Sequence, residues 1–133
     1  MNENIKNDII FIIIESIKAI KKQDLERLRF LSNRIVHDSS IYQDQYAISI
    51  SVIIYTLFKI LEKNVGSLDK VENSEKVIIT ELEKAKGAIS KEELNKYSNS
   101  LKKIILILKE LDKSTGIFIN EELQSSRIKQ AFG

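Results

Sequence analysis

The sequence contains no cysteine, no proline and no tryptophan, and these absences narrow what the protein can be. Without cysteine there is neither a disulfide framework nor a thiolate metal site, so zinc fingers and zinc ribbons are excluded. Without proline, and with only four glycines, little interrupts a long helix, whereas a strand-rich fold needs many tight turns. The composition therefore favours long helices joined by short turns.

Long apolar runs are also scarce near the N-terminus. The run from Ile9 to Ile14 is closed by Glu15, and the acidic residues Glu3 and Asp8 precede it. A secretory signal has a longer apolar region behind a basic flank, and a membrane span needs about 20 apolar residues. We therefore expect a cytoplasmic protein without a membrane segment.

The chain has almost no excess of one sign of charge, because its 21 basic and 19 acidic side chains leave a net charge of only +2. The surplus lies in residues 1–37, where we interpret it as a solvated helix face, with nucleic-acid binding as the alternative. Under that alternative, the nucleic-acid contacts are Lys18, Lys21, Lys22, Arg27 and Arg29.

What is present predicts an all-α fold. A chain of 133 residues with 43% hydrophobic side chains can bury one core without metal or disulfide support. The 3.6-residue periodicity predicts a single compact bundle of five or six helices in one domain over residues 1–133. The predicted helices cover about residues 3–22, 25–42, 44–63, 74–86, 90–113 and, at the C-terminus, 115–133.

Local signals predict where these helices begin and end. Asp24 and Asp44 are suitable N-caps, although Ser40 and Gln43 form an alternative capping box around the second of these boundaries. Gly66 and Gly87 each predict the end of a helix, the latter as a C′ residue. The run SKEE, residues 90–93, predicts a capping box that opens the next helix.

The third segment presents a conflict between strand and helix. Ile48, Ile50 and Val52 alternate with small residues, as they would in a strand. The apolar stretch nevertheless continues to Leu61 without a turn signal, which is longer than most strands. We therefore predict a buried central helix over residues 44–63.

The helix over residues 90–113 carries a long apolar seam with the three-and-four spacing of bundles and coiled coils. The segment from about Asn120 has apolar residues with no evident partner in the sequence. Both features predict association with a second copy or another protein. The seam residues are Leu94, Tyr97, Leu101, Ile104, Leu108 and Leu111.

Catalytic and cofactor sites have little support. The chain has one histidine, His37, so a di-iron bundle with two Glu-x-x-His motifs is excluded. No glycine-rich nucleotide loop occurs. Serines and aspartates lie near His37 in sequence, but this proximity does not make a catalytic triad. We expect no cofactor and no metal, and we favour a non-enzymatic protein.

Residues 32–44, SNRIVHDSSIYQD, hold the most concentrated polar side chains. On a helix Asn33 and His37 lie one turn apart on a common face, while Arg34 and Asp38 pair on an adjacent face. Either His37 is hydrogen-bonded to set helix register, or the residues form a binding or catalytic face. The predicted polar cluster comprises Ser32, Asn33, His37, Tyr42 and Asp44.

Residues 31–61 resemble a stretch in small uncharacterised helical proteins of archaea with an L-S-N-x-x-x-H-x-x-x-I-Y-Q-D signature. The stretch covers about a quarter of the chain. Some members continue into a helix-turn-helix segment after a basic helix similar to RIKQAF, residues 127–132, and the sequence here ends at Gly133. The matching residues are Leu31, Ser32, Asn33, His37, Ile41, Tyr42, Gln43 and Asp44.

The same region is similar to the HEPN superfamily, helical bundles that include RNA-cleaving toxins. Their dimers bring together an arginine and a histidine from an R-x(4–6)-H motif. Here Arg34 lies three residues before His37 and Arg29 lies eight before it, so the arginine at the expected spacing is missing. The resemblance implies a ribonuclease only if Arg34 or Arg29 takes the place of the missing motif arginine.

The sequence therefore predicts a self-associating, non-enzymatic interaction or regulatory module. The alternative is an HEPN-like, RNA-acting protein that uses His37 with Arg34 or Arg29.

Overall fold

Five α-helices make up the part of the chain that the structure, a computed structural model, describes: residues 1–63 and 68–112. No strand occurs in these residues, so the predicted all-α bundle is confirmed. The predicted C-terminal helix and the predicted stop at Gly66 lie outside the described residues. The helices are α1 (Glu3–Lys22), α2 (Leu25–Tyr42), α3 (Gln45–Lys63), α4 (Leu68–Ser90) and α5 (Leu94–Asp112).

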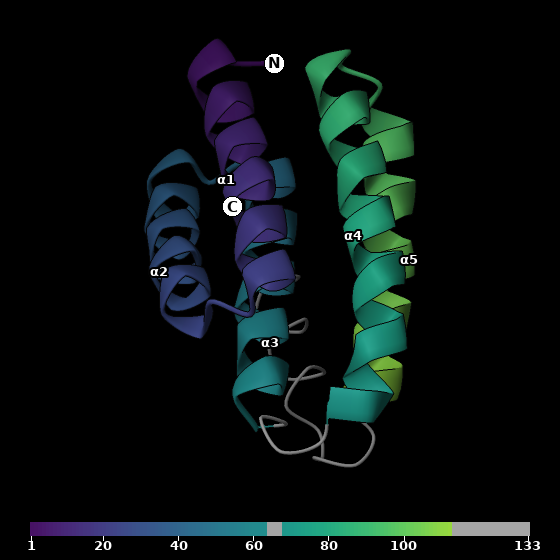
Figure 1. Ribbon diagram of the computed structural model, residues 1–133. Coiled ribbons are helices and arrows are strands. Elements are labelled where there is room, and N and C mark those ends of the chain that lie inside the picture. The colour runs from purple at the N-terminus through teal and green to yellow at the C-terminus, as the bar shows by residue number, and fades with distance from the viewer. Residues whose placement is uncertain (64–67, 113–133) are drawn as a thin grey trace.

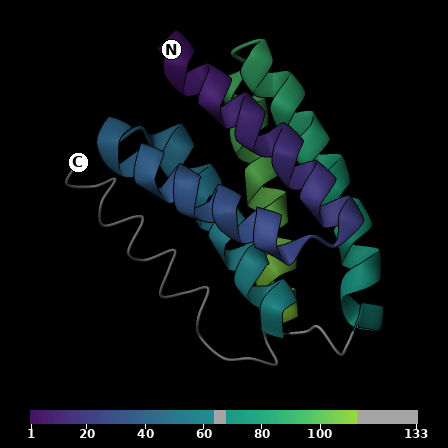
Figure 2. The same ribbon diagram turned by 60° about the vertical axis from the view of Figure 1, so that its left-hand side comes forward.

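The helices form a bundle with one member on its outside. α1 packs against α4, α4 against α5, and α5 against α3, while α1 and α3 also touch (Figure 1). α2 packs against α1 and α3 and lies at the edge of the bundle, on the side away from α4 and α5 (Figures 1 and 2). One long face of α2 is therefore left without a neighbouring helix among the described elements.

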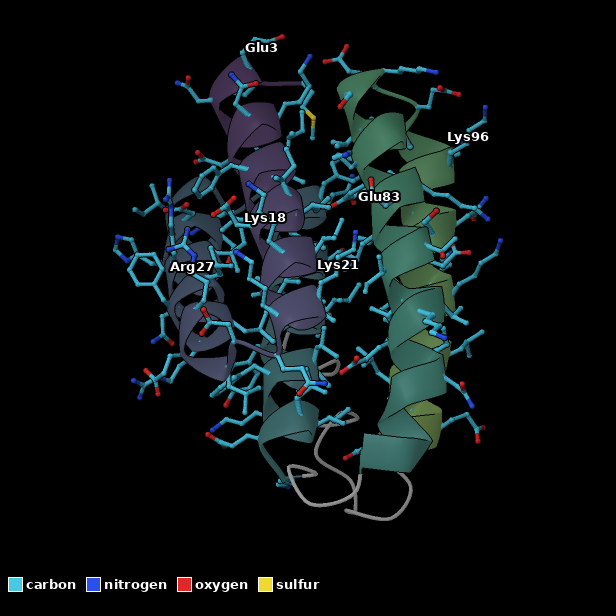
Figure 3. The ribbon with its side chains drawn as sticks, in the orientation of Figure 1. Glu3, Lys18, Lys21, Arg27, Glu83 and Lys96 are labelled. Atoms are coloured by element: carbon cyan, nitrogen blue, oxygen red, sulfur yellow. The ribbon has the colours of Figure 1, made fainter. Side chains whose placement is uncertain are left out.

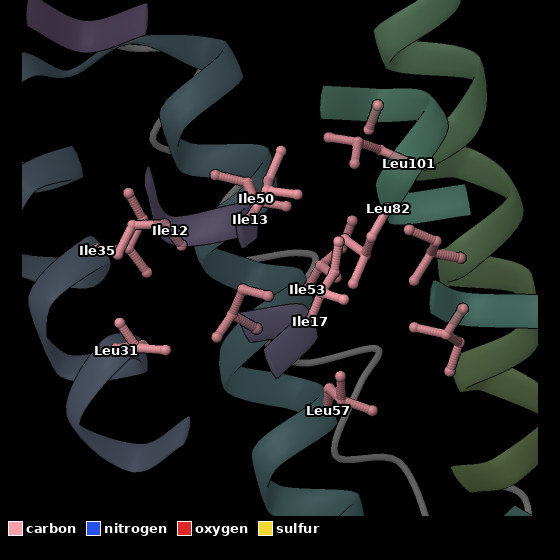
Figure 4. Close-up of a cluster of buried hydrophobic side chains, with 14 of the residues drawn as sticks. Ile12, Ile13, Ile17, Leu31, Ile35, Ile50, Ile53, Leu57, Leu82 and Leu101 are labelled. Atoms are coloured by element: carbon pink, nitrogen blue, oxygen red, sulfur yellow. The ribbon is translucent and has the colours of Figure 1, made fainter. Parts of the chain in front are cut away.

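The core is built mainly from isoleucine and leucine side chains contributed by all five helices. Ile13 and Ile17 of α1, Ile53 of α3 and Leu82 of α4 meet in its centre (Figure 4). Leu31 and Ile35 of α2 reach the same cluster from the side. Because these residues recur at helical spacing, each helix presents a continuous apolar stripe to its neighbours.

The strand-like alternation in the third segment has a packing explanation. Ile50 and Val52 are buried, but so are Ala47 and Ser51, which belong to the other half of the alternation. α3 contacts α1, α2 and α5, so it needs apolar or small residues around most of its circumference. The predicted central helix is confirmed, and its pattern reflects burial on several sides.

α3 is also the one helix among the described residues with the length and apolar composition to cross a membrane, with a mean hydropathy of 1.3 in its most apolar window. Of that window, 61% is buried against the other helices. A helix in the core of a globular protein can have the same length and apolar composition as a membrane-spanning helix.

Two predicted N-caps are confirmed. The Asp24 carboxylate accepts a hydrogen bond from the Arg27 amide at 3.0 Å at the start of α2. The Asp44 carboxylate accepts from the amides of Tyr46 and Ala47, at 2.8 and 3.0 Å, at the start of α3. Both carboxylates satisfy amides that lack a partner within the helix.

The predicted boundary between α4 and α5 is wrong. Gly87 does not end α4, and Ser90 does not cap α5, because α4 continues to Ser90 and the Ser90 hydroxyl donates back to the Lys86 carbonyl. The chain instead turns at Glu92, which has a left-handed backbone conformation with a φ of 57°. The Glu93 amide then donates to the Ala88 carbonyl at 2.9 Å. Burial of Ala88 and Ile89 favours the additional turn.

Tyr97 joins α5 to the start of α3. Its side chain is fully buried, and its hydroxyl donates to the Tyr46 carbonyl at 3.0 Å. The two tyrosine rings meet edge to face, with centroids 5.9 Å apart. Burial raises the pKa of the Tyr97 hydroxyl well above its usual value of 10.0, and the negative charge of Asp44 adds to this effect.

Candidate functional site

The structure divides the predicted polar cluster between two sides of α2. Ser32 is buried against the core, and its hydroxyl has no hydrogen-bond partner among the described residues. Asn33 and His37 lie together on the exposed side, one turn apart as predicted. Asp44 is half-buried and caps α3, and the Tyr42 side chain lies outside the described residues. Among the cluster members whose side chains the structure describes, only Asn33 and His37 therefore share a surface.

His37 belongs to an exposed stripe that we call the α2 outer face: Phe30, Arg34, His37 and Ile41. Successive members are four, three and four residues apart, which is the spacing of a heptad seam. Phe30 is 54% exposed and Ile41 is 63% exposed, although both are large and apolar. α2 thus carries two seams on opposite sides, one packed in the core and one facing outward.

Arginines of α2 lie against aromatic rings at the border with α1. The Arg34 guanidinium lies 4.6 Å from the centroid of the Phe11 ring, and Phe11 is 37% exposed. Arg34 also approaches the Asp38 carboxylate at 3.9 Å, as the sequence predicted. The Arg27 guanidinium lies 5.3 Å from the Phe30 ring. These contacts place the two guanidinium groups beside exposed aromatic rings.

Five of the seven basic side chains of residues 1–37 pair with a carboxylate in the structure. Glu15 accepts a hydrogen bond from Arg27 at 2.8 Å and lies 3.3 Å from Lys18 (Figure 3). The bond from Arg27, and secondly that from Lys18, lowers the pKa of Glu15. Arg29 pairs with Glu26 at 2.7 Å. Of the five predicted nucleic-acid contacts, Lys21 and Lys22 have no ion pair in the described part of the chain.

A second surface, between α4 and α5, was not predicted. Four lysines surround an open cleft of about 430 Å³ there. The available signal was spacing. Two of the lysines lie seven residues apart on α5, and the other two lie seven apart at the end of α4 and in the turn after it, so each pair shares an edge. Only the antiparallel pairing of α4 and α5 brings the two edges together. The lysines are Lys84, Lys91, Lys96 and Lys103.

A smaller apolar cavity of about 120 Å³ lies beside the turn between α1 and α2. Its lining includes Ile20, Leu28 and Leu61, with Asp24 and Glu75 at its polar side. Within residues 1–63 and 68–112, no group of three or more histidine, aspartate or glutamate side chains could hold a metal ion.

Comparisons with protein-family models, with curated proteins and with solved structures find no match for this chain.

Proposed function

We propose that the protein is a non-enzymatic interaction module that associates with a second copy of itself through the α2 outer face. The exposed heptad seam of α2 carries this proposal. A surface helix normally presents polar residues outward, whereas here Phe30 and Ile41 lie at seam positions with more than half of each residue exposed. Aromatic and arginine side chains are also the residues most enriched at protein interfaces.

The order of residues in the seam is complementary to itself in an antiparallel pair. In antiparallel coiled coils, each a residue faces a d residue of the other helix. Arg34 and Ile41 are at a positions when Phe30 and His37 are at d positions. Two antiparallel α2 helices therefore place Phe30 against Ile41 of the second copy at both ends, with Arg34 against His37 in the middle.

The surroundings of the seam support this arrangement. Arg34 is already held against Phe11, so it presents a largely preorganised side chain at the contact. Phe11 extends the apolar area of the contact beyond α2 itself. The two apolar layers would supply most of the binding energy, and the central Arg34 and His37 layers would set the register.

Sedimentation velocity tests the association. We expect the wild-type protein to dimerise at tens of micromolar and the variant Phe30→Ser/Ile41→Ser to be monomeric, because both apolar layers are lost. The matched control is Val77→Ser/Leu106→Ser, which replaces two other exposed apolar residues on α4 and α5 and should leave the dimer intact. A monomeric wild type, or equal loss in both variants, would contradict the proposal.

The alternative, an HEPN-like ribonuclease, is favoured by one observation. Arg34 and His37 lie on the same exposed face, and the antiparallel pairing just described brings Arg34 of one copy beside His37 of the other. Arg29 fits this role less well, because it pairs with Glu26. An imidazole beside a guanidinium could act as a general base near a stabilised phosphate.

RNA cleavage in the presence of a metal chelator separates the two functions. If the protein is a ribonuclease, His37→Ala and Arg34→Ala should each reduce the cleavage rate by about 100-fold or more, while Arg29→Ala should have little effect. Circular dichroism would verify that each variant is folded. Absence of cleavage by the dimeric wild-type protein would leave the interaction module as the function and eliminate the ribonuclease.

A further inference from the structure

The cleft between α4 and α5 lies on the opposite side of the bundle from α2, and nothing in the proposed self-association uses it. α5 packs against α4 and α3 but not against α2 among the contacts of the described helices (Figure 1). Lys96 projects outward from this side of the molecule (Figure 3). The cleft is therefore accessible in a monomer and in an α2-mediated dimer.

Its lysines are arranged in two facing pairs. Lys84 at the edge of α4 and Lys91 in the turn just after α4 lie seven residues apart, and Lys96 and Lys103 lie seven apart on the facing edge of α5. Seven residues of α-helix correspond to about 10 Å. Since α4 and α5 are joined by a short turn, they run antiparallel, with Lys91 opposite Lys96 at the turn and Lys84 opposite Lys103 one heptad away.

The charge of the cleft is only partly compensated. Lys84 pairs with Glu81 at 3.4 Å and Lys96 with Glu93 at 2.6 Å. Lys91 and Lys103 have no ion pair within the described residues. Glu93 is the one acidic side chain among the described residues that line the cleft, and these residues therefore carry an excess of positive charge.

The floor of the cleft is made of small residues. Gly87 and Ala88 of α4 and Ser100 of α5 contribute short side chains or none, and a Cβ atom placed on Gly87 would meet nothing within 4 Å beyond the adjacent backbone of its own helix. A ligand can therefore lie between the lysines and approach the helix backbone. Asn99 adds an amide donor at the rim.

These features favour a phosphate ligand over a protein partner. The lining residues in the described part of the chain include no aromatic and no large aliphatic side chain, so they offer no buried apolar anchor of the kind on which protein interfaces depend. Lysine is a compact point charge that binds phosphate oxygens, and contacts to a phosphodiester backbone need only such charges and an open groove. Without an aromatic ring for base stacking, binding would be independent of sequence.

We propose that the cleft bounded by Lys84, Lys91, Lys96 and Lys103 binds the phosphodiester backbone of single-stranded nucleic acid. The fluorescence anisotropy of a labelled oligothymidylate, measured at several salt concentrations, tests this. Four phosphate contacts on a single strand predict a slope of about −2.8 in log K against log salt. The affinity should then fall about 50-fold between about 50 and 200 mM NaCl.

Two variants with the same charge change distinguish this cleft from the rest of the surface. Lys91→Gln/Lys103→Gln should reduce the slope to about −1.4, so that affinity falls only about 7-fold over the same range. Lys21→Gln/Lys22→Gln, on α1, should retain the wild-type slope. Equal effects of the two variants, or a larger effect on α1, would overturn the proposal.

A third variant tests the cleft without changing its charge. Gly87→Leu would place a branched aliphatic side chain, which cannot stack on a base, in the open space over the floor and should weaken oligothymidylate binding at every salt concentration. Unchanged binding by Gly87→Leu would overturn the proposal, as would failure of the wild-type protein to bind. Displacement of the oligonucleotide by polyglutamate of equal charge would instead assign the cleft to acidic protein segments. Each of these outcomes is independent of whether the protein dimerises through α2.

Discussion

The serine, asparagine and histidine side chains of residues 32–39 take their roles from the side of α2 on which they lie. Ser32 and Ser39 face the core, where small side chains allow α2 to lie close to its neighbours. His37 and Asn33 face outward, where they contribute to a surface and are not enclosed by the bundle. Periodicity could predict that Asn33 and His37 share a face, but not that this face is exposed. That depends on where the other helices lie.

The buried hydrogen bond of Tyr97 allows a stability prediction for a single side chain. Tyr97→Phe removes the hydrogen bond to the Tyr46 carbonyl, so at neutral pH the free energy of unfolding should fall by about 0.5–1.5 kcal/mol. Urea unfolding of the two proteins measures this difference.

The same residue predicts a dependence on high pH. Because burial raises the pKa of Tyr97 in the folded protein above 10.0, only the unfolded chain releases this proton just above pH 10. Proton release then favours unfolding by about 1.4 kcal/mol per pH unit. The advantage of the wild type over Tyr97→Phe should therefore be constant below about pH 9, and should shrink and reverse as the pH rises towards 11. A constant difference across this range would contradict the prediction.

At the scale of the helix, α2 differs from the other helices because it has two seams. Leu28, Leu31 and Ile35 bury one side in the bundle, while Phe30 and Ile41 expose the other. A helix in a monomeric bundle needs only the first seam. The second, exposed seam is therefore the feature of α2 that favours binding to a further helix.

Cross-linking tests the antiparallel register of two α2 helices. The native chain has no cysteine, so each introduced thiol is unique. Phe30→Cys and Ile41→Cys should give little disulfide when each is oxidised alone, but a covalent dimer when the two proteins are mixed. Within one chain the two positions are about 16 Å apart along the helix, too far for a bond.

A parallel arrangement would give the opposite result. Phe30→Cys alone would then form a disulfide with itself, and mixing would add little. That outcome would retain self-association but exclude the Arg34–His37 layer and, with it, the geometry required for the ribonuclease.

At the scale of the whole molecule, the two proposed surfaces occupy opposite sides of one rigid core. α1 and α3 lie between α2 and the α4–α5 pair, and they hold many of the fully buried isoleucines (Figure 4). A dimer formed through α2 would place its two lysine clefts at the outer ends of the assembly. Two linked clefts would strengthen binding to a nucleic acid long enough to reach both.

The sequence by itself determined the helical class, the extent of α1 and the N-caps Asp24 and Asp44, because periodicity and capping act over a few residues. It also indicated the pairing of Arg34 with Asp38. Only the tertiary structure decided that α4 continues past Gly87, that Glu15 neutralises part of the basic N-terminal surface, and that four lysines meet between α4 and α5. These outcomes depend on burial and on contacts between residues far apart in the chain, which no local pattern specifies.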